Sequence, residues 1–140
     1  LLEFIKNDPD VHWVGFQNDV PLFLSLFDVF VLPAWWEGFG NVLIQAAAMG
    51  LPIVSTNVTG CRDAVSQNYN GTLVEKGDVE GVVKAISAYL DDPGLAVLHG
   101  ENGKKWAAKF RSEVIWDGLD NIYQSIKPME PHRASSAKEP

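Results

Sequence analysis

Short runs of β-branched and aromatic residues alternate with helical stretches along this chain, and this alternation limits its fold more than any other feature. The runs are Val11–Phe16, Val29–Pro33, Pro52–Thr56 and Gly71–Glu75. The second and third runs are apolar on both faces, as is typical of strands buried in a parallel sheet. Strands that alternate with helices predict an α/β fold, an open and mostly parallel sheet with flanking helices and right-handed crossovers.

The stretches between these runs carry helix start and stop signals. Asp19 is a good N-cap for a helix over 19–27, and Pro21 fits its first turn. An alanine-rich helix over 41–49 is expected to stop at Gly50. Asp78 is the expected N-cap of a later helix. Further helices are predicted at 61–67, 79–90, 94–109 and 112–127.

The chain is predicted to contain one partial domain followed by a tail. Residues 1–127 are predicted to form one ordered but partial domain, whose sheet would be completed by strands before Leu1. We therefore expect the chain to be a piece of a longer protein. Residues 128–140 are rich in Pro, Ser and Ala, lack apolar periodicity and are expected to form a disordered tail.

Composition excludes several classes of protein. The net charge is −7, with 18 acidic and 11 basic residues, which argues against nucleic acid as a partner. A single cysteine, Cys61, excludes an internal disulfide and fits a reducing, cytoplasmic setting. The longest apolar run, Val29–Trp36, is too short to span a membrane. No His and Cys cluster has metal-ligand spacing, so no metal is expected.

Candidate chemistry lies where strands lead into helices, because ligands of open α/β sheets bind at the carboxyl ends of the strands. Three connections meet this edge: Gly15–Asn18, Ala34–Asn41 and Asn57–Arg62. In the second, Gly38 and Gly40 flank Phe39 at the start of a helix, which suits a phosphate. Glu37 beside them suits sugar hydroxyls. Two interpretations stay open, a sugar nucleotide site and a tight turn without a ligand.

Other residues near this edge have competing interpretations. Cys61 is expected to be a packing residue at a helix start, and Arg62 either contacts a phosphate or forms a surface ion pair. One of Trp35 and Trp36 is expected in the core, and the other against a ligand. His12 is expected to be half-buried within the first strand.

The run from Pro33 to Thr56 resembles the signature of retaining GT-B glycosyltransferases of family 4, the glycosyl transferases group 1. That signature reads roughly PS-x-x-EGFG-x-x-x-x-EA-x-A-x-G-x-PV(I/V)-x-T. Motif order and spacing agree over roughly residues 10–127. Flanking segments at Val11–Gly15, Phe27–Pro33, Gly60–Val65 and Asn70–Val74 also resemble family motifs. The resemblance implies the C-terminal, donor-binding, Rossmann-like domain, without the acceptor-binding N-terminal domain.

The resemblance also implies roles for individual residues. Glu37 matches the first glutamate of the family's E-x7-E motif and would contact the donor sugar as the catalytic-site carboxylate. The turn Gly38, Phe39, Gly40 and Asn41 would bind sugar and diphosphate through its backbone amides. The second glutamate, which holds the ribose, is Gln45 here. If these eight residues were helical, they would rise about 12 Å, enough to reach from hexose to ribose. Further possible contacts are Gly15, Phe16, Gly60 and Arg62.

The activity implied by the resemblance is transfer of a hexose or N-acetylhexosamine from a nucleotide diphosphate sugar to a hydroxyl acceptor, with retention. No metal or other cofactor is implied. The segment Gly60–Val65 favours enzymes of bacterial surface polysaccharide synthesis, with a polyprenyl-diphosphate-linked glycan as acceptor, in the cytoplasm or at the inner face of the plasma membrane. Two alternatives remain: a non-catalytic nucleotide-sugar-binding module, and a nucleotide-sugar epimerase of GT-B fold.

Overall fold

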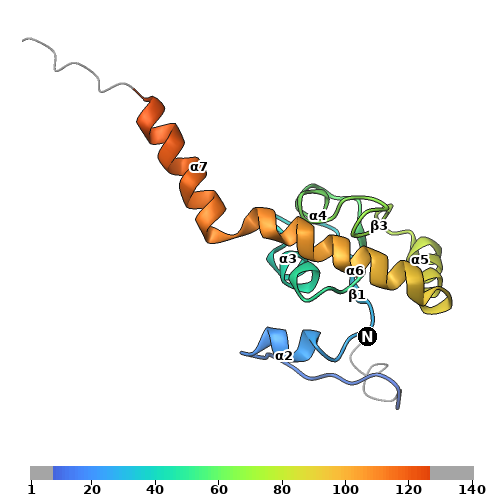
Figure 1. Cartoon of the computed structure of the whole chain (residues 1–140). Helices are drawn as coiled ribbons and strands as arrows, with labels where there is room; N and C mark the ends of the chain where they lie inside the picture. Colours follow the sequence, from blue (N-terminus) through green and yellow to red (C-terminus); the bar gives the residue numbers. More distant parts are fainter. Residues whose placement is uncertain (1–7, 127–140) are drawn as a thin grey trace, which may run out of the picture. The chain divides into compact units, whose positions relative to one another are not determined.

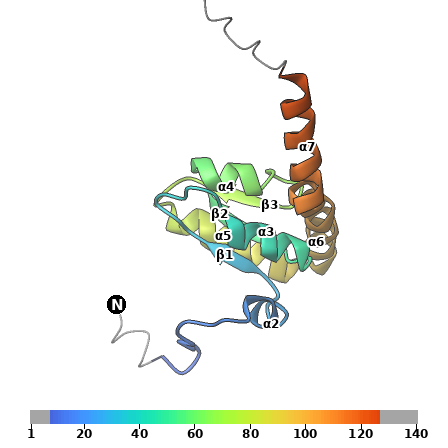
Figure 2. The same cartoon turned by 90° about the vertical axis from the view of Figure 1, so that its left-hand side faces the viewer.

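The structure is a computed structural model, and it describes residues 8–126. The described residues divide into two compact units, one that ends at Lys109 and one that begins at Phe110. The first unit (Figure 1) contains a parallel sheet with the strand order β1-β2-β3, and its three strands are labelled in Figure 2. Its strands are β1 (Phe30–Leu32), β2 (Ile53–Thr56) and β3 (Gly71–Val74). This confirms the predicted open parallel α/β sheet.

The helices of the first unit follow the predicted order. They are α2 (Val20–Leu24), α3 (Asn41–Ala48), α4 (Thr59–Ala64), α5 (Val79–Asp91) and α6 (Pro93–Ala107). Asp19 and Asp78 cap α2 and α5 as expected, because their carboxylates accept the backbone N–H of Leu22 and Gly81. Helix α2 is five residues long and therefore shorter than the helix predicted over 19–27.

The sheet separates two apolar clusters. Ile53 packs with α3, α4 and Ala107 of α6, whereas its neighbour Val54 packs with Ala85 and Tyr89 of α5. This alternation follows from the pleat of β2, whose successive side chains point to opposite faces. Since both faces are covered, every residue of β2 is buried.

Helix α6 lies beside α3 in both views (Figures 1 and 2). Two glycines of α6 allow this approach. A Cβ atom on Gly100 would overlap the backbone carbonyl of Gly50, and one on Gly103 would lie 3.2 Å from the carbonyl oxygen of Ala47. The backbones thus approach closely over about one helical turn, and a side chain at position 100 would not fit unless the Gly50 carbonyl moved.

Side-chain hydroxyls of β2 extend its pairing with β1. Ser55 Oγ donates to the carbonyl of Leu32 at 2.8 Å, and Thr56 Oγ1 donates to the carbonyl of Ala34 at 2.5 Å. Both hydroxyls belong to buried residues. The second bond holds the segment that leaves β1 after the last paired residue, and this segment leads into the candidate site.

The predicted first strand, Val11–Phe16, is wrong. This segment is exposed and forms no strand within residues 8–126, and His12 is therefore exposed rather than half-buried. A strand needs a neighbour for its backbone N–H and C=O groups, and none of the described residues pairs with this segment.

The second unit contains α7 (Ser112–Ser125), after a short 3₁₀ turn at Ala108–Phe110. The helix has an apolar stripe that includes Ile115, Trp116 and Tyr123, as predicted for 112–127. The predicted tail at 128–140 lies outside the described residues. Over residues 8–126, no helix combines the length and apolarity needed to cross a membrane.

Candidate functional site

The connection from β1 to α3 forms a tight turn, Glu37–Gly40, at the carboxyl edge of the sheet. Gly40 is the N-cap of α3 and offers no side chain to cap the helix. The N–H of Asn41 donates to the carbonyl of Phe39 at 2.7 Å, which closes the turn. The start of α3 therefore presents backbone amides and the positive end of the helix dipole without a side-chain acceptor, an arrangement that suits an anionic group.

Gly60 holds this turn from the next connection. Its N–H donates to the carbonyl of Glu37 at 3.2 Å. A Cβ atom at this position would lie 2.6 Å from the carbonyl oxygen of Glu37 and 2.7 Å from that of Gly38. Only glycine fits between α4 and the turn. The sequence predicted Gly60 as a possible ligand contact, and the structure shows that it positions the Glu37–Gly40 turn.

The side chain of Glu37 is half-buried and forms no hydrogen bond or ion pair within the described part of the chain. A carboxylate in this setting can accept hydrogen bonds from hydroxyl groups. Gln45 is exposed on α3, one turn into the helix. Helix α3 begins at Asn41, as predicted, so the eight residues from Glu37 to Gln45 are only partly helical. The helical part from Asn41 to Gln45 rises about 6 Å, not 12 Å.

Arg62 projects from α4 and is exposed. Its guanidinium donates to the side-chain oxygen of Asn57 and to the hydroxyl of Thr59, both at 3.4 Å. Asn57 in turn donates from Nδ2 to Oε1 of Glu75 at 2.9 Å. Within residues 8–126 Arg62 forms no ion pair, so of its two predicted roles the surface ion pair is not observed. Long bonds at an exposed site leave the guanidinium able to turn toward a ligand.

Aromatic side chains crowd the same edge. Trp35 is 71% exposed, Trp36 is 83% exposed and Phe39 is 46% exposed. The prediction that one tryptophan belongs to the core is therefore wrong, because the segment after β1 leaves the sheet before it reaches Trp35. Cys61 is fully buried at the start of α4, which confirms its predicted packing role.

The sequence predicted that a strand would bring Gly15 and Phe16 to this edge, and the structure does not show this. They lie in an exposed coil, and Gly15 has φ of +64° with open space around its Cβ position. The sheet that would have brought them to its carboxyl edge includes no strand before β1 among the described residues.

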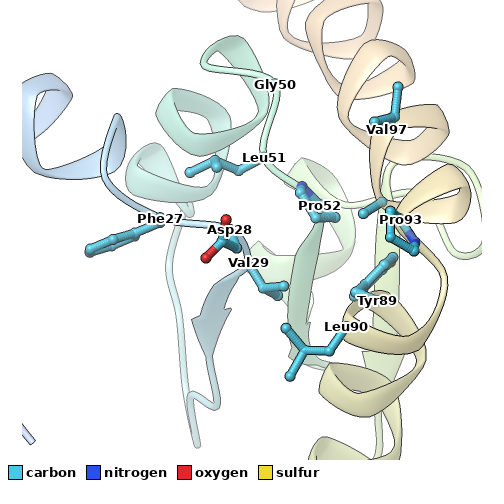
Figure 3. A pocket seen from close by; sticks show the side chains of 11 residues that line it. Phe27, Asp28, Val29, Gly50, Leu51, Pro52, Tyr89, Leu90, Pro93 and Val97 are labelled. Atoms are coloured by element: carbon cyan, nitrogen blue, oxygen red, sulfur yellow. The ribbon is translucent and has the colours of Figure 1, made fainter. Parts of the chain in front are cut away.

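A different cavity, of about 380 Å³, lies at the opposite edge of the sheet (Figure 3). Figure 3 shows that its lining includes Val29 and Pro52, which precede β1 and β2, and Leu90 near the end of α5. Its lining is mostly apolar, and it lies at the amino ends of the strands. It therefore cannot hold a ligand of the Glu37–Gly40 turn.

A buried polar chain that the sequence did not reveal links β3, α5 and α6. Thr72 Oγ1 lies 3.1 Å from the hydroxyl of Tyr89, which lies 2.7 Å from Nδ1 of His99. Burial lowers the pKa of His99, and a hydrogen bond to the backbone of Asn68 opposes this shift. Burial raises the pKa of Tyr89, against a smaller effect of the Thr72 bond. These three side chains join elements of the fold and include no residue of the Glu37–Gly40 turn.

In the described range, no group of three or more His, Cys, Asp or Glu side chains is arranged to hold a metal ion. The chain matches the family described as glycosyl transferases group 1 over residues 1–92. It belongs to this family. The resemblance of the Pro33–Thr56 signature is thereby confirmed.

Several curated glycosyltransferases are similar to the chain. It is 37% identical over 124 residues to the capsular polysaccharide biosynthesis glycosyltransferase CapM of Staphylococcus aureus, covering 88% of this chain and 33% of CapM. It is 34% identical over 110 residues to the UDP-Gal:alpha-D-GlcNAc-diphosphoundecaprenol alpha-1,3-galactosyltransferase of Escherichia coli, covering 79% and 28%. The chain thus spans about a third of the length of the relatives it matches.

Solved structures give the same result for the fold. The sucrose-phosphate synthase of Thermosynechococcus elongatus superposes with a TM-score of 0.79 at 31% identity, over 88% of this chain and 32% of that protein. Anabaena HepE in complex with UDP-glucose superposes with a TM-score of 0.75 at 22% identity, over 89% and 35%. The open parallel sheet of this chain is therefore the fold found in part of these GT-B glycosyltransferases.

Proposed function

We propose that this chain is the donor-binding part of a glycosyltransferase that moves a hexose or N-acetylhexosamine from a nucleotide diphosphate sugar to a hydroxyl acceptor, with retention. The observation that carries the proposal is the Glu37–Gly40 turn, which opens α3 at the carboxyl edge of the sheet and is held there by Gly60. Family membership gives this turn its context.

In this proposal the turn binds the diphosphate through its backbone amides and the sugar hydroxyls through a carboxylate. The amides of the turn, Gly38 and Gly40 among them, receive the diphosphate, whose negative charge grows as the sugar leaves. Glu37 accepts hydrogen bonds from the sugar hydroxyls, and Gln45 offers an amide to the ribose. Gln45 forms weaker bonds than a carboxylate would, by about 1–2 kcal/mol. No metal or other cofactor takes part in the proposed reaction.

We further propose bacterial surface polysaccharide synthesis as the setting, with a polyprenyl-diphosphate-linked glycan as acceptor. The support is that CapM is named for capsular polysaccharide biosynthesis, and the Escherichia coli relative for a diphosphoundecaprenol acceptor. We place the proposed reaction in the cytoplasm, at the inner face of the plasma membrane.

The test is transfer of labelled sugar from a panel of nucleotide diphosphate sugars to a polyprenyl-diphosphate-linked sugar, by the full-length protein that carries this chain. Glu37→Gln should lower turnover at least about 100-fold, the scale of losing one preorganised polar contact. Glu80→Gln, an exposed glutamate on α5, is the matched control and should keep full turnover. The anomeric configuration of the product, read by NMR, tests retention.

Two results would contradict the proposal. Donor binding without transfer to any acceptor would favour a non-catalytic module, and interconversion of the donor sugar would favour an epimerase. Full turnover in Glu37→Gln would remove Glu37 from the site.

A further inference from the structure

A second cavity, of about 280 Å³, lies at the carboxyl edge of the sheet. Its walls come from the segments that follow β1 and β3, from Thr56 at the end of β2, and from the first turn of α5. The lining residues that matter here are Trp35, Thr56, Glu75, Asp78, Val79 and Val82. Trp35 belongs to the same connection as the Glu37–Gly40 turn, so the cavity adjoins the proposed donor site without including it.

Trp35 forms an aromatic wall of this cavity. Its indole ring packs on the turn that follows β3, because Lys76 Nζ lies 5.5 Å from the ring centroid. Gly77, with φ of +85°, lies so close that a Cβ atom there would be 3.6 Å from the ring carbon Cη2. The ring lies beside this turn, yet Trp35 is 71% exposed. An exposed indole face is suited to pack against the C–H face of a pyranose ring.

Two carboxylates that line the cavity, Glu75 and Asp78, lie in the segment between β3 and α5. Glu75 uses Oε1 to accept the amide of Asn57 at 2.9 Å, and Asp78 uses Oδ1 to accept the N–H of Gly81 at 2.8 Å. Within residues 8–126, the second oxygen of each carboxylate has no hydrogen-bond partner. Each carboxylate is oriented by one bond and can accept a hydroxyl with the other oxygen.

The charges around the cavity discriminate between ligands. Glu75 and Asp78 line it, whereas Lys76 is the cation on the ring face of Trp35. A nucleotide also stacks on tryptophan, but its phosphates would be repelled by two carboxylates. A uronic acid would be repelled for the same reason. The arrangement suits an uncharged ring that carries several hydroxyl groups.

We propose that this cavity binds a neutral pyranose, with its C–H face on Trp35 and its hydroxyls on Glu75 and Asp78. We assign this sugar to the acceptor glycan, and this assignment rests on the proposed function. Its reason is that Trp35 and the donor-binding turn lie in the same connection between β1 and α3. That the cavity takes a pyranose rests only on its own residues.

The direct test uses ¹⁹F NMR of the full-length protein labelled with 5-fluorotryptophan. The Trp35 resonance is assigned by its loss in Trp35→Phe. Methyl glycosides of glucose, galactose and N-acetylglucosamine should shift this resonance with millimolar affinity. Glu75→Gln should weaken that binding about tenfold, the loss of one charge-assisted bond, while Glu80→Gln leaves it unchanged. Sorbitol, methyl glucuronide and UDP should not bind there.

The second test measures transfer by the same protein. Trp35→Ala should raise the acceptor KM about tenfold with an unchanged donor KM, and Trp35→Phe should restore most of the affinity. The pocket assignment is overturned if the pyranosides leave the Trp35 resonance in place, or if sorbitol or UDP shifts it equally. Pyranoside binding in a protein without transferase activity would contradict the proposed function and leave the pocket intact. A shifted resonance with an unchanged acceptor KM would overturn the acceptor role.

Discussion

The two ends of α3 are built in opposite ways. At its C-terminal end, Gly50 adopts φ of +81° and lies against α6, where Gly100 leaves no room for a side chain. At its N-terminal end, Gly40 supplies no side-chain cap, and the adjacent Phe39 is 46% exposed. One end is in backbone contact with another helix, whereas the other presents amides at the surface.

This difference separates stability from binding along a single helix. The packed end fixes where α3 lies, through Ala46 and Ala47, which are fully buried. The position of the N-terminal end of α3 follows from this packing. The hydrogen bond from Gly60 to Glu37 then fixes the turn that precedes the helix. Substitutions at the packed end should therefore change the free energy of unfolding, and substitutions at the open end should change affinity.

The largest effect is expected for Gly100→Ala. The new methyl group would overlap the carbonyl of Gly50, a backbone group that cannot turn aside. Overpacking of this kind costs about 3 kcal/mol, against a gain of up to about 1 kcal/mol from the better helix propensity of alanine. Urea denaturation measures the net loss. Gly118→Ala is the control, since nothing lies within 4 Å of its Cβ position, and unchanged stability of Gly100→Ala would show that α6 does not anchor α3.

A smaller loss of stability and a larger loss of binding are expected for Gly60→Ala. Its methyl group would push the carbonyls of Glu37 and Gly38 away and break the 3.2 Å bond to the turn. The turn is exposed and can move, so we expect a loss of about 1 kcal/mol in stability. Affinity for the nucleotide diphosphate sugar should fall about tenfold or more, as measured by calorimetric titration. Equal affinity for both proteins would mean that the turn does not bind the donor.

Gln45→Glu should sharpen the comparison, because Gln45 lies between the two ends. If Gln45 faces the ribose, the carboxylate should tighten nucleoside diphosphate binding about tenfold. Because Gln45 is exposed, no charge is buried and the free energy of unfolding should stay unchanged. Deoxyribose analogues should gain less. Titrations with an unchanged dissociation constant would remove Gln45 from the site.

The smallest effect is expected from His99, which belongs to α6 and supports the packed end. Its pKa is lowered from 6.5 in the folded protein by burial, so the unfolded chain binds the proton more tightly. The contribution of His99 to stability is therefore complete above pH 6.5 and declines as the pH falls through its lowered folded-state pKa. Denaturation curves across this range measure the slope. His99→Gln should flatten it.

The sequence predicted those elements whose partners are close in the chain. Strand β2 was visible because a run that is apolar on both faces can only be buried between two layers, and its end was marked by Asn57. The Val11–Phe16 run has similar composition but no neighbouring strand among the described residues, so composition alone misled the prediction. Strand formation depends on pairing, which a single run does not encode.

The candidate site was predictable in part for the same reason. The Glu37–Gly40 turn is local, and its glycines beside a helix start were sufficient to find it. The contact from Gly60 joins residues 23 positions apart and depends on the register of two loops. The Trp35 cavity needs the connections after β1 and β3, the end of β2 and the start of α5 to meet. No spacing rule in the sequence contains that information.

The bond from Gly60 to the carbonyl of Glu37 has a consequence for how such a protein diversifies. Both partners are main-chain atoms, so the shape of the turn is inherited independently of the side chains around it. Trp36, Phe39 and Arg62 can then be exchanged one at a time without misplacing the amides. Lineages that keep glycine at position 60 can thus explore new sugars through small steps, each of which leaves a working scaffold.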